Sequence, residues 1–270
     1  MSTIPSPNLI VLGAQKSGTT TLHHYLQGHP DIHMSRPIKE PGYFLDDEVI
    51  RTHYLGDRHA SLRREALLDE YMSRGYRGEP YFGDSSTAYT LGTRARRLEI
   101  PQRIRREVPD AKLVYIVRNP WARIVSAFLH ELGKGRGAGN INGFLNSPGG
   151  HQAIRTSHYA SQIAAYLEHF PRSQIQILLF EDLVERGEES MQPLWAFLDL
   201  PPTRLGRPRQ LNRSTNRADV DPADLLFSPA WYNRLAATLV EDAQSLLRLA
   251  DRDTDTWDLG ERWRRPVATG

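Results

Sequence analysis

The sequence predicts an α/β fold in which a single domain holds one parallel β-sheet flanked by helices. Short apolar runs of strand length alternate along the chain with segments of helical periodicity. The first of these runs is continuously apolar, as expected for a strand that is covered on both faces. The 270 residues are enough for one large α/β domain, and no change in composition marks a domain boundary.

The predicted strands are the short apolar runs. The first is "NLIVLG" at residues 8–13, and the clearest is "KLVYIVR" at residues 112–118. Three further segments are predicted to contain strands, two of them running into turns: 31–35, 80–86 and 174–183. Because helical segments separate these runs, we expect the strands to be parallel and to form one sheet.

The predicted helices lie between the strands. Leu22, Tyr25 and Leu26 recur at helical spacing, and "GHPD" at residues 28–31 ends that helix. Further helices are predicted at residues 46–75, 102–110, 121–132 and 158–170. Beyond the last predicted strand the chain is expected to be mostly helical, around a loop rich in proline and arginine at residues 201–217.

Composition excludes several classes of protein. The chain has no cysteine, which excludes disulfides, thiolate zinc sites and cysteine nucleophiles. A formal net charge of +2 is by itself too small to indicate a nucleic-acid partner. No apolar run approaches the ~20 residues that span a bilayer, and residues 1–8 lack the pattern of a signal peptide. We therefore expect a soluble cytoplasmic protein.

The segment "GAQKSGTT" at residues 13–20 occupies the position of a phosphate-binding loop (P-loop), between a strand and a helix. Its backbone N–H groups and the positive end of the helix dipole would form an anion site. Gly13 and Gly18 permit a close approach of backbone to ligand, and Lys16 adds a charge. Three hydroxyl groups complete the loop: Ser17, Thr19 and Thr20. The alternative is an ordinary strand-to-helix turn with a surface lysine.

The loop differs from the nucleotide pattern GxxxxGK[ST], because its lysine precedes the second glycine. A nucleoside triphosphatase also needs an acidic magnesium ligand, often at the end of another strand. The clearest strand ends instead in Arg118, and Ser126 follows early in the next helix. An arginine and a hydroxyl form a plausible second phosphate site. The alternative role for Arg118 is a structural ion pair.

Four segments, taken in order, resemble the sulfotransferases that use 3′-phosphoadenosine 5′-phosphosulfate (PAPS). The resemblance is nearest to the carbohydrate and heparan sulfate branch and its stand-alone bacterial relatives. The segments are "GAQKSGTTTLHHYLQGHPDI" (13–32), "KEPGYF" (39–44), "GDSSTAY" (83–89) and "LVYIVRNPWARIVSAFLHE" (113–131). Each motif alone is weak, but their order and spacing are specific, and the likeness covers most of the chain.

The resemblance implies where the donor binds. The loop would hold the 5′-phosphosulfate through Gln15, Lys16, Ser17, Gly18, Thr19 and Thr20. Arg118 and Ser126 would hold the 3′-phosphate, and Lys16 would neutralise charge on the bridging oxygen of the leaving phosphate. The basic loop at residues 204–217 would wrap the product adenosine 3′,5′-bisphosphate (PAP). Its expected contacts are Arg213, Ser214 and Arg217. A plain basic surface loop is the alternative.

The resemblance also implies that Glu40 is the general base that takes the acceptor's proton. Without it, Glu40 would be interpreted as a solvated loop residue, and His158 and His33 are rival bases. Animal heparan sulfotransferases carry a lysine after the acidic residue of the third motif, where this chain has Asp84-Ser85-Ser86. This difference puts a heparan-like acceptor in doubt, and Lys39 is a candidate replacement for that lysine.

The glycine-rich segment at residues 133–150 is interpreted as too flexible for a core element. It could close over an acceptor as a lid, and a disordered surface loop fits the pattern equally well.

The sequence therefore predicts a PAPS-dependent sulfotransferase, with one sulfotransferase domain over residues 1–270. The expected acceptor is a hydroxyl or amine of a small molecule, a natural product or a carbohydrate, and no metal or nucleic acid is expected to take part. One alternative is a P-loop small-molecule kinase, and another is a catalytically inactive nucleotide-binding module.

Overall fold

The structure is a computed structural model and describes residues 4–46, 64–91, 94–136, 139–204 and 220–266. Internal contacts divide the chain into two compact units. The sheet unit comprises Met1–Val117 and Ile163–Leu211, and the helical unit comprises Arg118–Gln162 and Asn212–Gly270. Each unit is assembled from two separate stretches of chain, so no single point in the sequence divides them. One sulfotransferase domain spanning residues 1–270 stays a prediction.

The described residues of the sheet unit form five strands, all parallel, in the spatial order β2-β3-β1-β4-β5. The strands are β1 Leu9–Gly13, β2 Ile32–Met34, β3 Tyr81–Asp84, β4 Lys112–Val117 and β5 Ile175–Leu179. Leu9 of β1 pairs with Gly83 on one side and with Lys112 on the other. Each strand lies within a predicted apolar run, and the α/β fold with a parallel sheet is confirmed.

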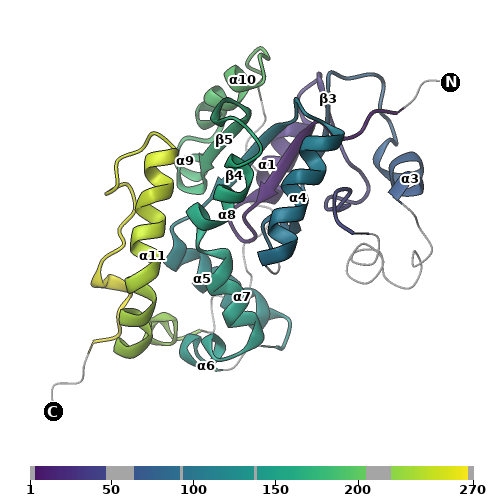
Figure 1. Cartoon of the computed structure of the whole chain (residues 1–270). Coiled ribbons are helices and arrows are strands. Elements are labelled where there is room, and N and C mark those ends of the chain that lie inside the picture. Colours follow the sequence, from purple (N-terminus) through teal and green to yellow (C-terminus); the bar gives the residue numbers. More distant parts are fainter. Residues whose placement is uncertain (1–3, 47–63, 92–93, 137–138, 205–219, 267–270) are drawn as a thin grey trace. The chain divides into compact units, whose positions relative to one another are not determined.

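The central strand β1 is buried along its whole length because helices cover both faces of the sheet. Leu9 and Val11 point to one face, where they join a core cluster with Leu22 and Leu26 of α1 (Thr19–Gln27). In Figure 1, α1 lies behind the sheet and α4 (Arg94–Glu107) lies in front of it. The carboxyl end of β1, where the predicted loop begins, is therefore held between β3 and β4.

Three segments of the sheet unit differ from their prediction. α4 begins at Arg94 and contains Pro101, whereas the sequence predicted its start after that proline. A proline removes one backbone donor, and this helix continues through it. The last strand ends at Leu179, because Phe180–Arg186 forms helix α9. Within the predicted helix at 46–75, the described part forms α3 Arg64–Leu67 and a π-helical turn at Leu68–Met72, and residues 47–63 lie outside the described residues.

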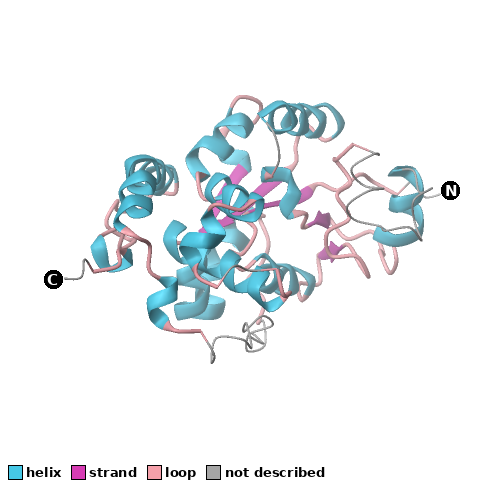
Figure 2. Cartoon of the chain, turned by 90° about the horizontal axis from the view of Figure 1, so that it is seen from below, coloured by secondary structure: helices cyan, strands magenta, loops and turns pink. Residues whose placement is uncertain are grey.

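The helical unit contains no strand among its described residues (Figure 2). Its main helices are α5 Pro120–Gly133, α6 Ile141–Leu145, α7 Pro148–Thr156 and α11 Pro229–Leu249, and α8 (Tyr159–Leu167) begins here. Trp121 of α5 stacks on Tyr232 of α11, with ring centroids 5.1 Å apart, and also contacts Phe227. No helix that the structure describes combines the length and hydrophobicity needed to cross a bilayer.

The prediction that residues 133–150 are too flexible for a core element is wrong. α6 and the start of α7 lie in this segment, and α6 buries Ile141, Phe144 and Leu145 in the core of the helical unit. Asn140 and Ser147 cap the two helices by accepting backbone N–H bonds. A side chain at Gly150 would meet the backbone oxygen of Phe144 at 2.1 Å, so this glycine permits close packing. Ile141, Phe144 and Leu145 do have helical spacing, but this pattern is short and lies among many glycines.

Candidate functional site

The loop at residues 13–20 joins the carboxyl end of β1 to α1. Its start is tied to the neighbouring strand, because the Ala14 backbone N donates to Ile116 O at 2.6 Å. Lys16 and Gly18 both have left-handed backbone, with φ of 69° and 89°. Such a conformation is uncommon for a residue other than glycine and occurs often where a backbone holds a ligand. A Cβ at Gly18 would meet the Phe180 ring at 2.4 Å, so the position requires glycine.

Ser17 supports an anion site in this loop. Its hydroxyl is fully buried, and no hydrogen-bond partner for it is found among the residues that the structure describes. Buried polar groups are nearly always hydrogen-bonded, so an unsatisfied hydroxyl points to a missing partner. The first N–H groups of α1 also begin here, and they too lack partners within the helix. The loop therefore fits a phosphate-like group.

A second loop brings an acidic side chain to the first one. Lys39 Nζ donates to Glu40 Oε1 at 2.9 Å and to Thr19 Oγ1 at 3.4 Å. Thr19 is the first residue of α1, so Lys39 links the Glu40 carboxylate to the anion loop. The Lys39 and Glu40 side chains keep exposed fractions of 23% and 30%. Glu40 is thus oriented by its neighbours and still accessible to another molecule.

The other carboxylate oxygen of Glu40 is held from the segment that follows β3. Glu40 Oε2 accepts from Thr87 Oγ1 at 2.8 Å and from the Thr87 backbone N at 3.2 Å. Both oxygens therefore have fixed donors, which restrict the rotamer of Glu40. Sequence reasoning did not identify Thr87 individually, although it lies within the motif at residues 83–89.

Asp84 is a further residue that sequence reasoning did not assign to the site. It ends β3, is fully buried, and accepts from Ser86 Oγ (2.5 Å), the Tyr43 backbone N (3.1 Å) and Tyr89 Oη. Burial raises the pKa of Asp84 to about 6, although the bonds from Ser86 and Tyr89 oppose that shift. The only sequence signal was its place in the motif at residues 83–89.

His23 of α1 also lies beside this region. Its Nδ1 is 3.1 Å from Ser85 Oγ, and its side chain is buried. Burial, together with the nearby Lys39 ammonium, lowers the pKa of His23 to about 3, so the ring is neutral at neutral pH. Helical spacing could have found it, because His23 follows Thr19 by one turn on the same face of α1.

The two histidines considered as rival bases have structural surroundings. His33 Nε2 lies 2.7 Å from the Met72 backbone O, and its ring packs against Phe82 in the core. Both ring nitrogens of His158 have partners, the Ile154 backbone O and Thr238 Oγ1, each at 3.0 Å. These contacts favour roles in packing and capping.

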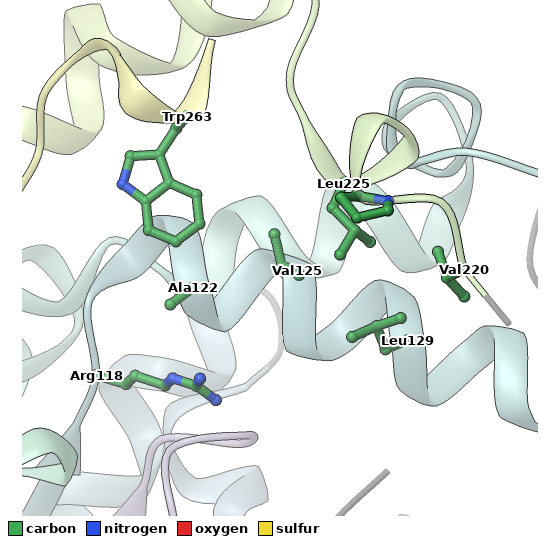
Figure 3. Close-up of a pocket in the computed structure, with 8 residues that line it drawn as sticks. Arg118, Ala122, Val125, Leu129, Val220, Leu225 and Trp263 are labelled. Carbon is green, nitrogen blue, oxygen red and sulfur yellow. The ribbon is translucent and has the colours of Figure 1, made fainter. Parts of the chain in front are cut away.

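In the helical unit, Arg118 lines a cavity of about 290 Å³. Figure 3 shows its guanidinium at one side of the cavity, with Trp263 on another side and Val125 and Leu129 of α5 beyond. The Asn119 side chain caps α5 by accepting from the Trp121 and Ala122 backbone N atoms, which sets the direction of the helix directly after Arg118. The cavity is largely apolar, with one cationic side chain.

The remaining predicted residues come from α5 and from the basic loop at residues 204–217. Ser126 lies within α5 and is partly buried. Arg213, Ser214 and Arg217 lie outside the described residues. Within the part of the chain that the structure describes, no three His, Asp or Glu side chains gather into a potential metal site. Independence from metal ions stays a prediction.

Comparison with protein families finds a match over most of the chain. The model described as "Sulfotransferase family" matches residues 7–204. Among curated proteins, a heparan sulfate glucosamine 3-O-sulfotransferase 3B1 of Mus musculus is 27% identical over an alignment of 201 residues that covers 72% of this chain and 46% of that protein. A bifunctional heparan sulfate N-deacetylase/N-sulfotransferase 1 of Caenorhabditis briggsae is 26% identical over an alignment of 211 residues that covers 72% of this chain and 23% of that protein. The chain thus spans less than half the length of these relatives.

A solved structure is similar over nearly the whole chain. It is a sulfotransferase from Alicyclobacillus acidocaldarius, with a TM-score of 0.70 and 26% sequence identity. The match covers 94% of this chain and 99% of that one. The match therefore extends into both units, and the two proteins are of comparable length.

Proposed function

The chain belongs to the sulfotransferase family, and from that premise we propose that it transfers a sulfuryl group from PAPS to a hydroxyl or amine of an acceptor. Membership of the family confirms the predicted class of enzyme. One observation carries the finer proposal. The partly exposed Glu40 carboxylate is joined through Lys39 to Thr19 in a loop suited to an anion. A candidate base and a candidate donor site are thus linked by direct contacts.

The donor's 5′-phosphosulfate is assigned to the loop, from Gln15 to Thr20. The buried, unsatisfied hydroxyl of Ser17 supports this assignment, since a donor oxygen would supply its missing partner. Arg118 and Ser126 are assigned to the 3′-phosphate, and the cavity beside the Arg118 guanidinium supports a ligand there. The predicted contacts of Arg213, Ser214 and Arg217 with PAP remain part of the proposal.

The transfer step needs a proton acceptor and a stabilised leaving group. The acceptor's oxygen or nitrogen forms a bond to sulfur while the bond from sulfur to the bridging phosphate oxygen breaks. The electron pair of the broken bond stays on that oxygen, where Lys16 offsets the negative charge. The acceptor's proton passes to the Glu40 carboxylate. Thr87 and Lys39 keep both oxygens of Glu40 in a defined orientation for this transfer.

Lys39 is proposed as the cation beside the base. The third motif has Ser85 where animal heparan enzymes carry a lysine, and Ser85 hydrogen-bonds to neutral His23 instead. Lys39 Nζ reaches both Glu40 and Thr19, so an ammonium group is supplied from a different position. We propose a small molecule, a natural product or a carbohydrate as the acceptor. A cytoplasmic location stays a prediction.

Isothermal titration calorimetry tests the donor. We expect PAP to bind the protein without added metal, and ATP with magnesium to bind much more weakly. Preference for ATP with magnesium would contradict the proposal and favour the kinase alternative, which no observation currently supports. Incubation with PAPS and a panel of phenols, amines and amino sugars, followed by mass spectrometry, then tests for transfer. If PAP binds tightly but neither a sulfated acceptor nor free sulfate from transfer to water is formed, the protein would instead be an inactive binding module.

A further inference from the structure

The loop that follows Glu40 is fastened by three consecutive backbone N–H groups. Each of them donates to a different buried side chain, one from the last residue of β3 and two from the segment after it. We call these three side chains, Asp84, Ser86 and Tyr89, the Asp84 cluster. The bonds are Gly42 N to Ser86 Oγ (2.7 Å), Tyr43 N to Asp84 Oδ2 (3.1 Å) and Phe44 N to Tyr89 Oη (3.1 Å).

The Asp84 carboxylate orients the other two members of the cluster. Ser86 and Tyr89 each have one hydroxyl proton, and both donate it to Asp84. Their remaining lone pairs are then free to accept the loop's N–H groups. Without the Asp84 oxygens, the two hydroxyls would lose their common acceptor, and their orientation toward the loop would no longer be specified.

The same segment also holds Glu40 directly. Thr87, between Ser86 and Tyr89, donates to Glu40 Oε2 through its hydroxyl and its backbone N. The loop backbone and the Glu40 carboxylate are therefore fixed to one short stretch of chain. Asp84 itself has no exposed surface, so it cannot contact an acceptor.

We propose that Asp84 is a positioning residue, whose carboxylate organises Ser86 and Tyr89 into acceptors for the loop and so fixes the position of Glu40. This inference rests on the proposed role of Glu40 as general base. Asp84 acts through the loop and does not touch the reactants. Loss of Asp84 should therefore lower turnover while leaving donor binding intact.

The charge state of Asp84 is part of the inference. The charged or titratable groups that face it are Tyr89, a donor, and Glu40, whose negative charge raises the pKa of Asp84. With that pKa at about 6, Asp84 is mostly ionised at neutral pH and accepts all three bonds. Protonation would turn one of the roughly four acceptor positions of this carboxylate into a donor that needs a partner of its own.

Amide hydrogen exchange measured by NMR tests the positioning directly. In Asp84→Ala we expect exchange at Gly42, Tyr43 and Phe44 to be at least about tenfold faster than in the wild type, as expected for lost hydrogen bonds. Tyr89→Phe removes a single oxygen and should accelerate exchange mainly at Phe44. Asp84→Asn keeps one acceptor oxygen, which can receive the Tyr43 N–H, and should retain much of its protection.

Asp242→Ala is the matched control. Asp242 is also a buried carboxylate that accepts two backbone N–H groups, from Ala160 and Ser161, and the Ser161 hydroxyl. Its loss should destabilise the protein without changing the relative protection at residues 42–44. Equal acceleration at these amides in the Asp242 and Asp84 variants, or none in Asp84→Ala, would overturn the inference. If Asp84→Ala fails to fold, the exchange rates of residues 42–44 in Tyr89→Phe and Asp84→Asn test the inference in its place.

Kinetics on the same samples connect the loop to catalysis. With PAPS as donor and water as acceptor, release of PAP in Asp84→Ala should have a kcat at least about tenfold lower, with KM for PAPS within about threefold of the wild type. Asp84→Asn should recover part of the lost kcat. Normal kcat despite faster exchange at residues 42–44 would overturn the positioning role. Failure of the wild type to bind PAP would refute the proposed donor, while the exchange experiment would still decide whether Asp84 holds the loop.

Discussion

Replacing Glu40 by glutamine is the sharpest test of the proposed chemistry. Glutamine keeps the size of the side chain and one acceptor oxygen, which can still receive both Thr87 donors. Its NH₂ group then faces Lys39 Nζ, so a donor meets a donor where the wild type has an ion pair of 2.9 Å. The substitution thus removes the basicity and one local contact.

The two possible roles of Glu40 predict effects of different size. The Lys39–Glu40 pair is partly exposed, and such pairs contribute about 0.2–1 kcal/mol. If Glu40 were only a structural partner of Lys39, its loss would lower kcat by at most about fivefold. General-base catalysis typically contributes ~10²–10⁴-fold, which corresponds to about 3–5 kcal/mol in the barrier. We therefore expect kcat of Glu40→Gln to fall by ~10²–10⁴-fold, with Tm changed by only a few degrees.

The assay follows PAP release from PAPS under single-turnover conditions, with calorimetry of PAP binding on the same variant. PAP affinity should stay within about threefold of the wild type, because Glu40 faces the acceptor. Glu168→Gln, an exposed acid in the same unit, serves as the control and should retain full activity. A fall in kcat below about fivefold, or a parallel loss of PAP binding, would refute the assignment of Glu40 as base.

Four further predictions address the donor, the metal, the rival base and pH. The wild type should bind PAP about 10- to 150-fold more tightly than 5′-AMP, and Arg118→Ala should remove most of this difference; equal wild-type affinities would contradict the 3′-phosphate site. Activity should survive EDTA, whereas a strict requirement for magnesium would favour a kinase. His158→Ala should retain near-normal kcat in the PAPS assay, because both ring nitrogens have structural partners; loss of turnover there with normal turnover in Glu40→Gln would reverse the assignment. Burial raises the pKa of Asp84 from its usual 3.8 to about 6, so the folded state holds this proton more tightly than the unfolded chain. The contribution of Asp84 protonation to stability should be greatest below pH 3.8 and be lost as pH rises to about 6. The fall in Tm over this pH range should be missing in Asp84→Asn.

The sequence by itself determined the parts of this protein that depend on local patterns. Short strand-like segments identified the five strands of the described residues, and the order strand, loop, helix placed residues 13–20 at the end of β1. The left-handed backbone at Gly18 follows from the residue type and its place before α1. Family resemblance selected Glu40, although nothing in its immediate neighbours distinguished it from a solvated loop acid.

Local patterns were insufficient for α6 and α7. Glycines dominate residues 133–150, and the buried residues of α6 occupy barely more than one turn, which is too short for periodicity to be recognised. What stabilises this segment is packing against residues distant in sequence, as in the cluster that joins Phe144 to Leu235 and Leu239.

Only the tertiary structure decided how the site is assembled. Lys39 meets Thr19, His23 meets Ser85, and Asp84 meets Tyr43, and each pair joins segments that the sequence separates widely. The parallel sheet brings the residues after β1, β2 and β3 to one edge, and only there do these side chains come within hydrogen-bonding distance. Burial of Asp84 and His23 at that edge then shifts the pKa of each group, because desolvation depends on the packed environment and not on the residue's neighbours in the chain.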